Sequence, residues 1–177
     1  MAARGFIELL RLADLAQARQ SGRRSRDNAQ WVGVAFELGG ERFVAPMGEV
    51  SEVLAMPSAV TPVPLSKPWL IGVANVRGRL LPLTDLTTFL SLSAPAVRIN
   101  QRKVMVIDQP ELLSGFLVDR VLGIQQFDRD DYVAESLTDD SPFLPYNHGR
   151  FEKDGQSWLV FMPSLLTEDN RYLEAAI

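Results

Sequence analysis

Apolar and polar positions follow two different periods along this chain, and the change comes near residue 30. Residues 4–19 place Phe, Ile, Leu and Ala on one broad face and charged residues elsewhere, which predicts an amphipathic helix. Residues 20–30 are polar and rich in arginine, which is typical of a linker. Two roles for the helix stay open at this point: it packs on the body of the protein, or it docks on a partner.

From Trp31 onward the pattern changes to short apolar runs separated by glycine, proline and polar turns. We predict two groups of about five strands, over about 31–95 and about 96–168, and a C-terminal helix over 163–173. Many short strands with helices only at the edges are typical of a β-barrel or sandwich. Two barrels of this size would each be marginal alone, so we expect them to share a core.

The most specific arrangement is a predicted hairpin with a helix directly after it. Apolar runs flank a short polar break in which Asn75 and Gly78 suit positive φ angles, so we predict a tight turn. Pro82 lies within the second run and predicts an edge strand or a bend. Asp85 is a suitable N-cap for a short helix over 86–92. This arrangement holds no nucleophile and no set of metal ligands, which points away from catalysis.

Composition limits the class of protein further. Hydrophobic residues make up 46% of the chain, enough for a sizeable core, and the formal net charge of -4 gives a pI near 5.1. We do not expect an acidic chain to bind nucleic acid or an acidic membrane surface. The chain has no cysteine, which excludes disulfides, thiolate metal sites and cysteine nucleophiles and fits a reducing cytoplasm.

Apolar runs in this chain are too short for a membrane span. A spanning helix needs about 18 or more consecutive apolar residues, and no such stretch is present. Charged residues interrupt the segment 6–15, which argues against a signal peptide. We therefore expect a cytoplasmic location.

Sequence motifs give little support for catalysis. His148 is the single histidine, and no G-x-S-x-G sequence accompanies it. Asp128, Asp130 and Asp131 lack the spacing, glycine and terminal glutamate of an EF-hand. The chain has no P-loop and no G-x-G-x-x-G sequence. We therefore expect no enzyme activity, no catalytic residues, no metal site and no cofactor.

Several side chains have more than one interpretation. Arg77 is either a solvated turn residue or a fixed arginine at a groove between barrels, where its guanidinium makes forked hydrogen bonds to carbonyls or a carboxylate. Trp69 is expected in the core or at a barrel edge rather than as an interface anchor. By default we expect Val50 and Val53 to face inward and Glu52 to be solvated.

Four segments, in order, resemble the CheW-type chemotaxis coupling proteins. Residues 50–53 are similar to the family's Val-x-Glu-Ile element, and residues 72–86 are similar to its signature of strand, turn and strand. Residues 114–121 resemble its Val-Gly-hydrophobic-Val-Asp-x-Val strand, and residues 158–166 resemble its last strand and closing helix. The similarity extends over roughly residues 31–168.

This resemblance implies a mainly β fold of two intertwined SH3-like five-stranded β-barrels with short helices. Residues 1–30 would then be an N-terminal helical extension, and residues 31–177 a CheW-like domain. The resemblance also implies a non-enzymatic adaptor that binds the regulatory domain of a CheA-type histidine kinase and the cytoplasmic tip of a methyl-accepting chemoreceptor. Such an adaptor would be a monomer in isolation and would join membrane-associated receptor arrays without inserting into the membrane.

By position, the resemblance implies two binding surfaces. An apolar groove between two barrels suits an amphipathic helical hairpin of a receptor. The kinase-binding positions are Gly72, Ile124 and Val50, although Val50 can belong to either surface. The receptor-binding positions are Glu52, Val53, Asn75, Arg77 and Val104.

Some features depart from the flagellar members of the family. The N-terminal helix with its arginine-rich linker, together with residues 31–36, is more similar to the PilI-type adaptor of the type IV pilus (twitching motility) chemosensory system. Lys103 replaces an apolar residue and Ala55 replaces a glycine-containing turn, which affects the expected receptor more than the fold.

We therefore expect an adaptor of the pilus pathway. The main alternative is a CheW adaptor of a flagellar or other chemosensory pathway. A remote alternative from another class is a β-barrel nucleic-acid-binding module, which would need basic and aromatic residues interleaved on one face. Only residues 19–26 are basic, and they hold no aromatic residue.

Overall fold

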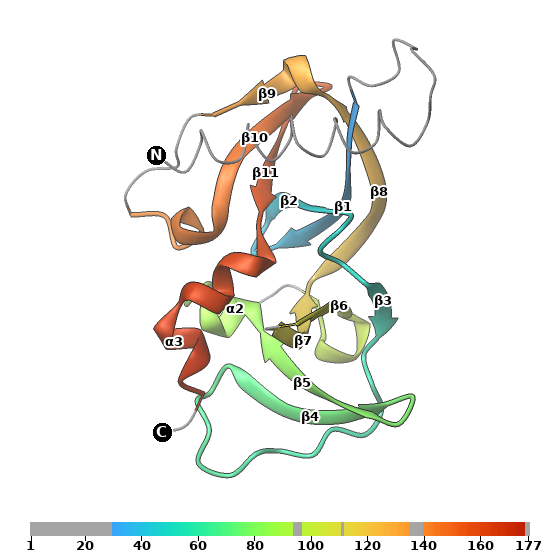
Figure 1. Cartoon of the computed structure of the whole chain (residues 1–177), viewed down its shortest axis with the longest axis vertical. Coiled ribbons are helices and arrows are strands. Elements are labelled where there is room, and N and C mark those ends of the chain that lie inside the picture. The colour runs from blue at the N-terminus through green and yellow to red at the C-terminus, as the bar shows by residue number, and fades with distance from the viewer. Residues whose placement is uncertain (1–29, 94–96, 111, 135–139, 176–177) are drawn as a thin grey trace.

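Two curled β-sheets are stacked along the long axis of the molecule (Figure 1). The predicted helix over 4–19 and the predicted linker up to residue 29 lie outside the described residues. The prediction of a mainly β fold is confirmed by the order of elements. This computed structural model describes residues 30–93, 97–110, 112–134 and 140–175.

Each sheet is a single run of hydrogen-bonded strands. The first sheet has the order β8-β1-β2-β11-β10-β9, with β1 Gln30–Leu38, β2 Glu41–Pro46, β8 Arg120–Asp128, β9 Tyr132–Val133, β10 Asn147–Lys153 and β11 Gln156–Phe161. The second sheet has the order β3-β6-β7-β5-β4, with β3 Glu52–Ala55, β4 Leu70–Val76, β5 Arg79–Asp85, β6 Lys103–Gln109 and β7 Leu112–Val118.

Helical elements in the described residues are short. They are α2 Leu86–Phe89, η2 Ile99–Gln101, η3 Arg129–Asp131, η4 Leu144–Tyr146, η5 Pro163–Glu168 and α3 Asn170–Leu173. None of these described helices has the length and apolar character that a membrane crossing requires.

The two sheets do not correspond to the two halves of the sequence. After β2 the chain crosses to the second sheet, forms all of its strands, and returns to the first sheet with β8. The predicted division near residue 95 does not match this arrangement, because the rhythm of strand lengths does not reveal which strands pair. The first sheet also has a sixth strand, β9, which pairs with β10 at Val133↔Arg150 and Tyr132↔Phe151.

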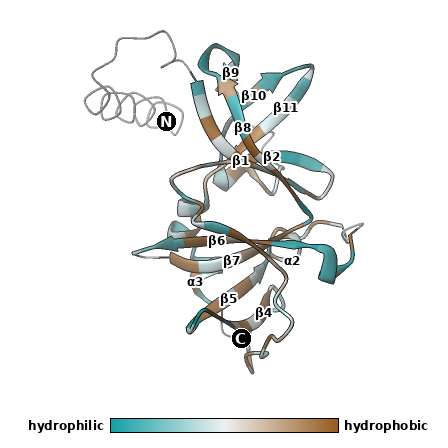
Figure 2. Cartoon of the chain, turned by 90° about the vertical axis from the view of Figure 1, so that its right-hand side faces the viewer, coloured by the Kyte–Doolittle hydropathy of each residue, from teal (hydrophilic) through white to brown (hydrophobic). Residues whose placement is uncertain are grey.

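Three apolar clusters form the core, one inside each curled sheet and one between the sheets. The cluster between the sheets joins Phe36 and Phe43 of the first sheet to Met105 and Phe116 of the second, and this confirms the expected shared core. Apolar colour accordingly gathers where the sheets meet, and polar colour at strand ends and turns (Figure 2). Burying one large apolar side chain contributes about 1.5–3 kcal/mol, so each sheet stabilises the other through this cluster.

Pro82 lies in an interior strand, which corrects the prediction of an edge. Strand β5 has β4 on one side and β7 on the other. The parallel ladder with β7 covers only Leu83–Asp85, so Pro82 lies just before it. Proline is tolerated there because the β7 side of the strand has no ladder partner at that residue.

Helix α2 begins as the sequence predicted. The Asp85 side chain accepts a hydrogen bond of 3.0 Å from the backbone N–H of Thr87, so Asp85 is its N-cap. The helix ends at Phe89, earlier than the predicted residue 92.

The C-terminal segment returns to the second sheet and closes the shared core. The single helix predicted over 163–173 is divided into η5 and α3, because Asp169 between them is extended with φ -93 and ψ 111. Tyr172 stacks on Trp69 with ring centroids 5.3 Å apart, and its hydroxyl lies 3.3 Å from Thr84 Oγ1. Trp69 is therefore a partly buried residue packed against the shared core, which agrees with the expected position in the core or at a barrel edge.

Candidate functional site

Arg77 and Glu52 join the two ends of the second sheet. Strands β3 and β4 are the first and last strands in its order, so no ladder connects them. Glu52 begins β3, and Arg77 lies in the turn between β4 and β5. Arg77 Nη2 lies 2.8 Å from Glu52 Oε2, and the two side chains are 73% and 30% exposed. The ion pair spans the opening of the curled sheet and leaves most of the guanidinium accessible to a partner.

The turn geometry places the Arg77 side chain. Arg77 and Gly78 are the two residues between the strands, with φ +53 and +80, as a type I′ hairpin requires. This corrects the prediction that Asn75 takes the positive φ, because Asn75 is a strand residue of β4. The Asn75 Oδ1 atom instead accepts a hydrogen bond of 3.0 Å from the Gly78 N–H, which holds the turn closed.

Glu52 and Val53 face the opposite way from the default expectation, whereas Val50 faces inward as expected. Val50 is buried before the strand begins, whereas Val53 is 39% exposed. Glu52 is half-buried and shares a face of β3 with Leu54, which packs against the apolar cluster inside the second sheet. The expectation of an inward Val53 and a solvated Glu52 was therefore wrong, because Glu52 faces the sheet opening where Arg77 compensates its charge.

A small pocket lies beside the Arg77–Glu52 pair. A second ion pair, Arg79 Nη1 to Asp108 Oδ2 at 2.5 Å, forms part of its wall. The hydrogen bond from Arg79 holds the pKa of Asp108 below its usual value. Leu81 and Val106 of the inner cluster reach the pocket, so its surroundings are charged at the rim and apolar beneath. The lining residues are Ser51, Glu52, Val76, Arg79, Leu81, Val106, Asp108 and Leu113.

Three of the predicted contact residues are buried and contribute little or no surface. Val104 is 0% exposed inside the second sheet, and Val50 is 9% exposed in the shared core. Gly72 is also buried, and a Cβ atom there would lie 2.4 Å from the carbonyl oxygen of Thr61. The structure gives these residues packing roles that explain their identity without a direct contact to a partner.

Ile124 is an exposed apolar residue on the edge of the first sheet. It lies on β8 opposite Val34 of β1, and 62% of its surface is exposed. The neighbouring Gly123 has φ +88, and the β1–β8 ladder shifts register close by. Strand β8 lies on the same side of the molecule as β3 (Figure 1). The exposed kinase candidate Ile124 thus lies on a different sheet from the receptor candidates, whereas the kinase candidate Gly72 lies on the second sheet with them.

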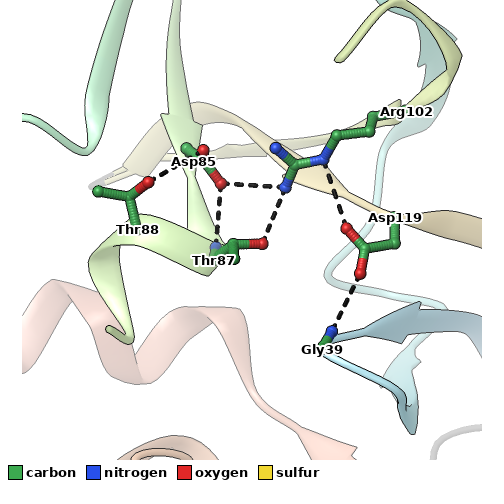
Figure 3. A network of polar contacts seen from close by, with 6 residues as sticks. All are labelled: Gly39, Asp85, Thr87, Thr88, Arg102 and Asp119. Atoms are coloured by element: carbon green, nitrogen blue, oxygen red, sulfur yellow. Dashed lines mark hydrogen bonds and ion pairs between the residues drawn. The ribbon is translucent and has the colours of Figure 1, made fainter. Parts of the chain in front are cut away.

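Sequence reasoning missed a buried polar network centred on Arg102 (Figure 3). The Arg102 side chain is 2% exposed, and its Nη2 atom donates 3.0 Å hydrogen bonds to Asp85 Oδ1 and Thr87 Oγ1. Its Nε atom lies 3.4 Å from Asp119 Oδ1, and the Gly39 N–H donates to Asp119 Oδ2 at 3.0 Å. Arg102 stands among polar residues in the sequence, so no local signal marks it as buried.

The network joins elements of both sheets. Asp85 ends β5, Asp119 lies between β7 and β8, and Gly39 is in the turn between β1 and β2. Burial alone would raise the pKa of Asp85, but the hydrogen bonds and charge of Arg102 outweigh it and leave the pKa below its usual value. The carboxylate charge of Asp85 is thus retained at neutral pH in a site that is mostly shielded from water.

The single histidine of the chain is partly buried on a strand of the first sheet. His148 lies on β10, half-buried, and its carbonyl oxygen accepts a hydrogen bond of 2.8 Å from the hydroxyl of Tyr132. Burial lowers the pKa of His148. Within the described ranges, no three His, Cys, Asp or Glu side chains are grouped so that they could hold a metal ion.

Known proteins resemble this chain over most of its length. The family model for the CheW-like domain matches residues 32–171. Protein PilI of Pseudomonas aeruginosa is 42% identical over 147 residues, which cover 83% of this chain and 81% of that protein. The chemotaxis protein CheW of Helicobacter pylori is 28% identical over 166 residues, which cover 92% of this chain and 98% of that protein.

A solved structure has the same fold. The scaffolding protein TtCheW from Thermoanaerobacter tengcongensis aligns with a TM-score of 0.64 and 17% identity, covering 74% of this chain and 88% of that one. At this identity the likeness concerns the fold alone. Together with the family model, which spans both sheets, it places the two curled sheets and their shared core in one known architecture. The chain belongs to the CheW-like family.

Proposed function

We propose that this protein is a non-enzymatic adaptor that couples a chemoreceptor to a CheA-type histidine kinase in a chemosensory pathway controlling type IV pilus twitching motility. The observation that carries the proposal is the 42% identity to PilI over most of both chains. The Helicobacter and Thermotoga CheW proteins are each 28% identical to this chain. The higher identity to PilI favours the pilus pathway over a flagellar one.

The receptor-binding surface is centred on the Arg77–Glu52 pair. Val53 and Asn75 are exposed on the strands that carry the pair, so an apolar side chain and an amide lie near the charges. The apolar face of a receptor's helical hairpin would cover Val53, and its polar residues would meet the exposed guanidinium of Arg77. Val104 and Val50 support this surface from within rather than touching the partner.

The kinase-binding surface is centred on Ile124. An exposed isoleucine on an edge strand suits the apolar end of another β-barrel, and the regulatory domain of a CheA-type kinase is itself CheW-like. Gly72 contributes through the packing of β4 against residues 60 and 61 rather than as a contact. In this scheme the adaptor works by binding alone, in the cytoplasm at membrane-associated receptor arrays.

A pull-down with purified components tests the proposal. The full chain is the bait, and the preys are the CheA-type kinase and the chemoreceptor cytoplasmic fragments encoded in the same genome. Arg77→Ala is expected to lose the receptor fragment selectively, and Ile124→Asp is expected to lose the kinase selectively. Matched controls are Arg42→Ala, which removes another ion-paired arginine, and Leu65→Asp, which changes a residue that is 80% exposed.

The outcomes separate the pathways. Binding of a kinase and receptor encoded with pilus genes supports the proposal. Binding only to the partners of a flagellar system would reassign the protein to that pathway. Failure of the wild-type chain to bind any of these kinases or receptors would overturn the coupling role.

A further inference from the structure

The buried Arg102 network lies between the strands that carry the two proposed binding surfaces. Arg102 immediately precedes β6, and β6 pairs with β3 at Glu52↔Val106 and Val53↔Met105. Asp119 immediately precedes β8, the strand that carries Ile124. One ion pair, Arg102–Asp119, therefore connects the start of β6, the ladder partner of β3, to the start of β8.

Arg102 is held unequally by its two carboxylates. Toward Asp85 and Thr87, its Nη2 atom makes two hydrogen bonds of 3.0 Å. Toward Asp119 the Nε–Oδ1 distance is 3.4 Å, and neither atom has an aligned hydrogen-bond partner although both are buried. A buried ion pair of this kind recovers less of its desolvation cost than an aligned one. The Arg102–Asp119 contact, which joins the two sheets, is thus held less tightly than the Arg102–Asp85 contact and is the one that can change its geometry.

Asp119 is in turn tied to the first sheet. Its Oδ2 atom accepts the Gly39 N–H of the β1–β2 turn at 3.0 Å, and its own N–H donates to the Glu37 carbonyl oxygen at 3.0 Å. Strand β1 carries Val34, which pairs with Ile124. A shift of Asp119 relative to Arg102 therefore moves the base of β8 together with the end of the β1–β2 hairpin.

We propose that Arg102 is a positioning residue that couples the two binding surfaces: through its contact with Asp119, occupation of the receptor surface changes the affinity of the kinase surface. This inference rests on the proposed function. Binding of one partner would then change the affinity of the adaptor for the other partner. A passive scaffold would instead bind each partner independently of the other. Coupling of this kind is a reciprocal free energy between two sites.

The test measures that coupling directly on the full-length chain. The Kd for the purified CheA-type regulatory domain is measured by calorimetry for the free adaptor and for the adaptor saturated with the receptor cytoplasmic fragment. The ratio of the two Kd values is the coupling factor, expected to be at least about fivefold in the wild type. Asp119→Asn keeps the side-chain shape and an oxygen for the Gly39 N–H but removes the charge that faces Arg102. Arg102→Lys keeps the charge but loses the planar guanidinium, whose separate nitrogen atoms face the two carboxylates.

Both variants are expected to keep each separate Kd within about threefold of wild type and to reduce the coupling factor below about twofold. The partly exposed Arg42, which pairs with Glu37 at 3.8 Å, supplies the matched control Arg42→Lys, expected to keep full coupling. If Arg102→Lys fails to fold, the near-isosteric Asp119→Asn decides the question alone.

A purely structural role for Arg102 predicts a different result. Stability would fall in both variants, and the coupling factor would stay at its wild-type value, which would overturn the inference. A wild-type protein that binds both partners with a coupling factor of one would also overturn it while leaving the adaptor role intact. A wild-type protein that binds neither partner would instead overturn the proposed function.

The Gly39 amide gives a second readout. Its N–H reports on Asp119 and lies in the β1–β2 turn, on the other sheet from the receptor surface. In a nuclear magnetic resonance titration with the receptor fragment, this amide is expected to shift in the wild type and to stay unchanged in Arg102→Lys. An unchanged Gly39 signal in the wild type at receptor saturation would contradict transmission through this contact.

Discussion

The guanidinium of Arg77 lies 2.8 Å from the carboxylate of Glu52 and thereby bridges the two free ends of the second sheet. The pair combines both interpretations that the sequence left open for Arg77. The side chain is fixed by a carboxylate, and it is also 73% exposed. A charge that is held in place and still accessible is suited to recognition, because little ordering remains to be done on binding.

Arg77→Ala should weaken receptor binding with little effect on stability. An exposed ion pair contributes at most about 1 kcal/mol to folding, so the midpoint of urea unfolding should hardly change. Loss of a central charged contact should lower the affinity for the receptor fragment by at least about tenfold. Calorimetric titration and chemical denaturation of the same sample check the two parts.

A charge-reversed double variant separates direct recognition of the receptor by Arg77 from a structural role of the Arg77–Glu52 ion pair. Arg77→Glu places two carboxylates together, and adding Glu52→Arg restores an ion pair of opposite orientation. We expect the double variant to regain stability but not receptor affinity, because the partner meets a reversed charge. Recovery of affinity in the double variant would show that the pair only holds the hairpin against β3.

Gly72→Ala should destabilise the fold rather than remove a kinase contact. The added Cβ would meet the Thr61 carbonyl oxygen at 2.4 Å, where Thr61 and Val73 exchange backbone hydrogen bonds of 2.8 and 2.9 Å. Gly72 also has φ +155, which side chains of L-residues rarely adopt. Overpacking of this kind costs about 1–3 kcal/mol, measurable as a lower urea midpoint.

Gly48→Ala is the matched control for Gly72→Ala. A Cβ at Gly48 meets nothing within 4 Å, so its stability should stay close to wild type. If Gly72→Ala unfolded at the same urea concentration as Gly48→Ala, the close approach of Thr61 would not be what restricts residue 72. The proposed kinase surface is better examined with Ile124→Asp, because that side chain is exposed.

Local features of this fold could be predicted, because they depend on neighbouring residues. The glycine-containing turn after β4 and the Asp85 cap of α2 follow from backbone φ preferences and from the unpaired N–H groups of a helix start. The turn assignment still erred by placing Asn75 rather than Arg77 at positive φ. Asparagine was favoured for its tolerance of that conformation, whereas its side chain serves the turn as a hydrogen-bond acceptor.

Long-range features could not be predicted from the pattern. The crossing of the chain between sheets after β2 and before β8 depends on which apolar faces fit together, and strand spacing carries no such information. The candidate surface residues came from a family resemblance, which gives positions without their burial. The structure exposes Arg77 and Ile124 but buries Val104. Arg102 had no signal at all, since a buried arginine is recognisable only once its carboxylates are placed around it.

Protonation of Asp85 should make the protein less stable in acid. Its pKa in the folded chain is lowered, so its stabilising effect is complete above the ordinary carboxyl pKa of about 4 and is lost as the pH falls through the lower folded value. Asp85→Asn should cost about 1–3 kcal/mol at pH 7, because Arg102 loses a charged partner. The difference in urea midpoint between wild type and variant should shrink as the pH falls to about 3.

An equal difference at neutral and acid pH would contradict this account of Asp85. It would mean that the carboxylate charge is not what holds Arg102, and that the loss in the variant comes from packing or from the helix cap. Thr88→Ala is a useful companion, because the Thr88 hydroxyl also donates to Asp85, at 3.1 Å, but carries no charge. Its effect on stability should vary with pH much less than that of Asp85→Asn.

Tyrosine ionisation should be suppressed in the folded protein. The chain has three tyrosines, and burial raises the pKa of Tyr132 and of Tyr146 to about 12 and raises that of Tyr172 as well. A raised folded pKa stabilises the native state below the ordinary value of about 10, and this contribution is lost as the pH rises through the folded value. Near-ultraviolet absorbance should therefore show little tyrosinate at about pH 10 in the native protein and half-ionised tyrosines in urea. Native protein that ionises all three tyrosines near pH 10 would contradict their burial, and Tyr146→Phe should remove one tyrosine from the alkaline transition.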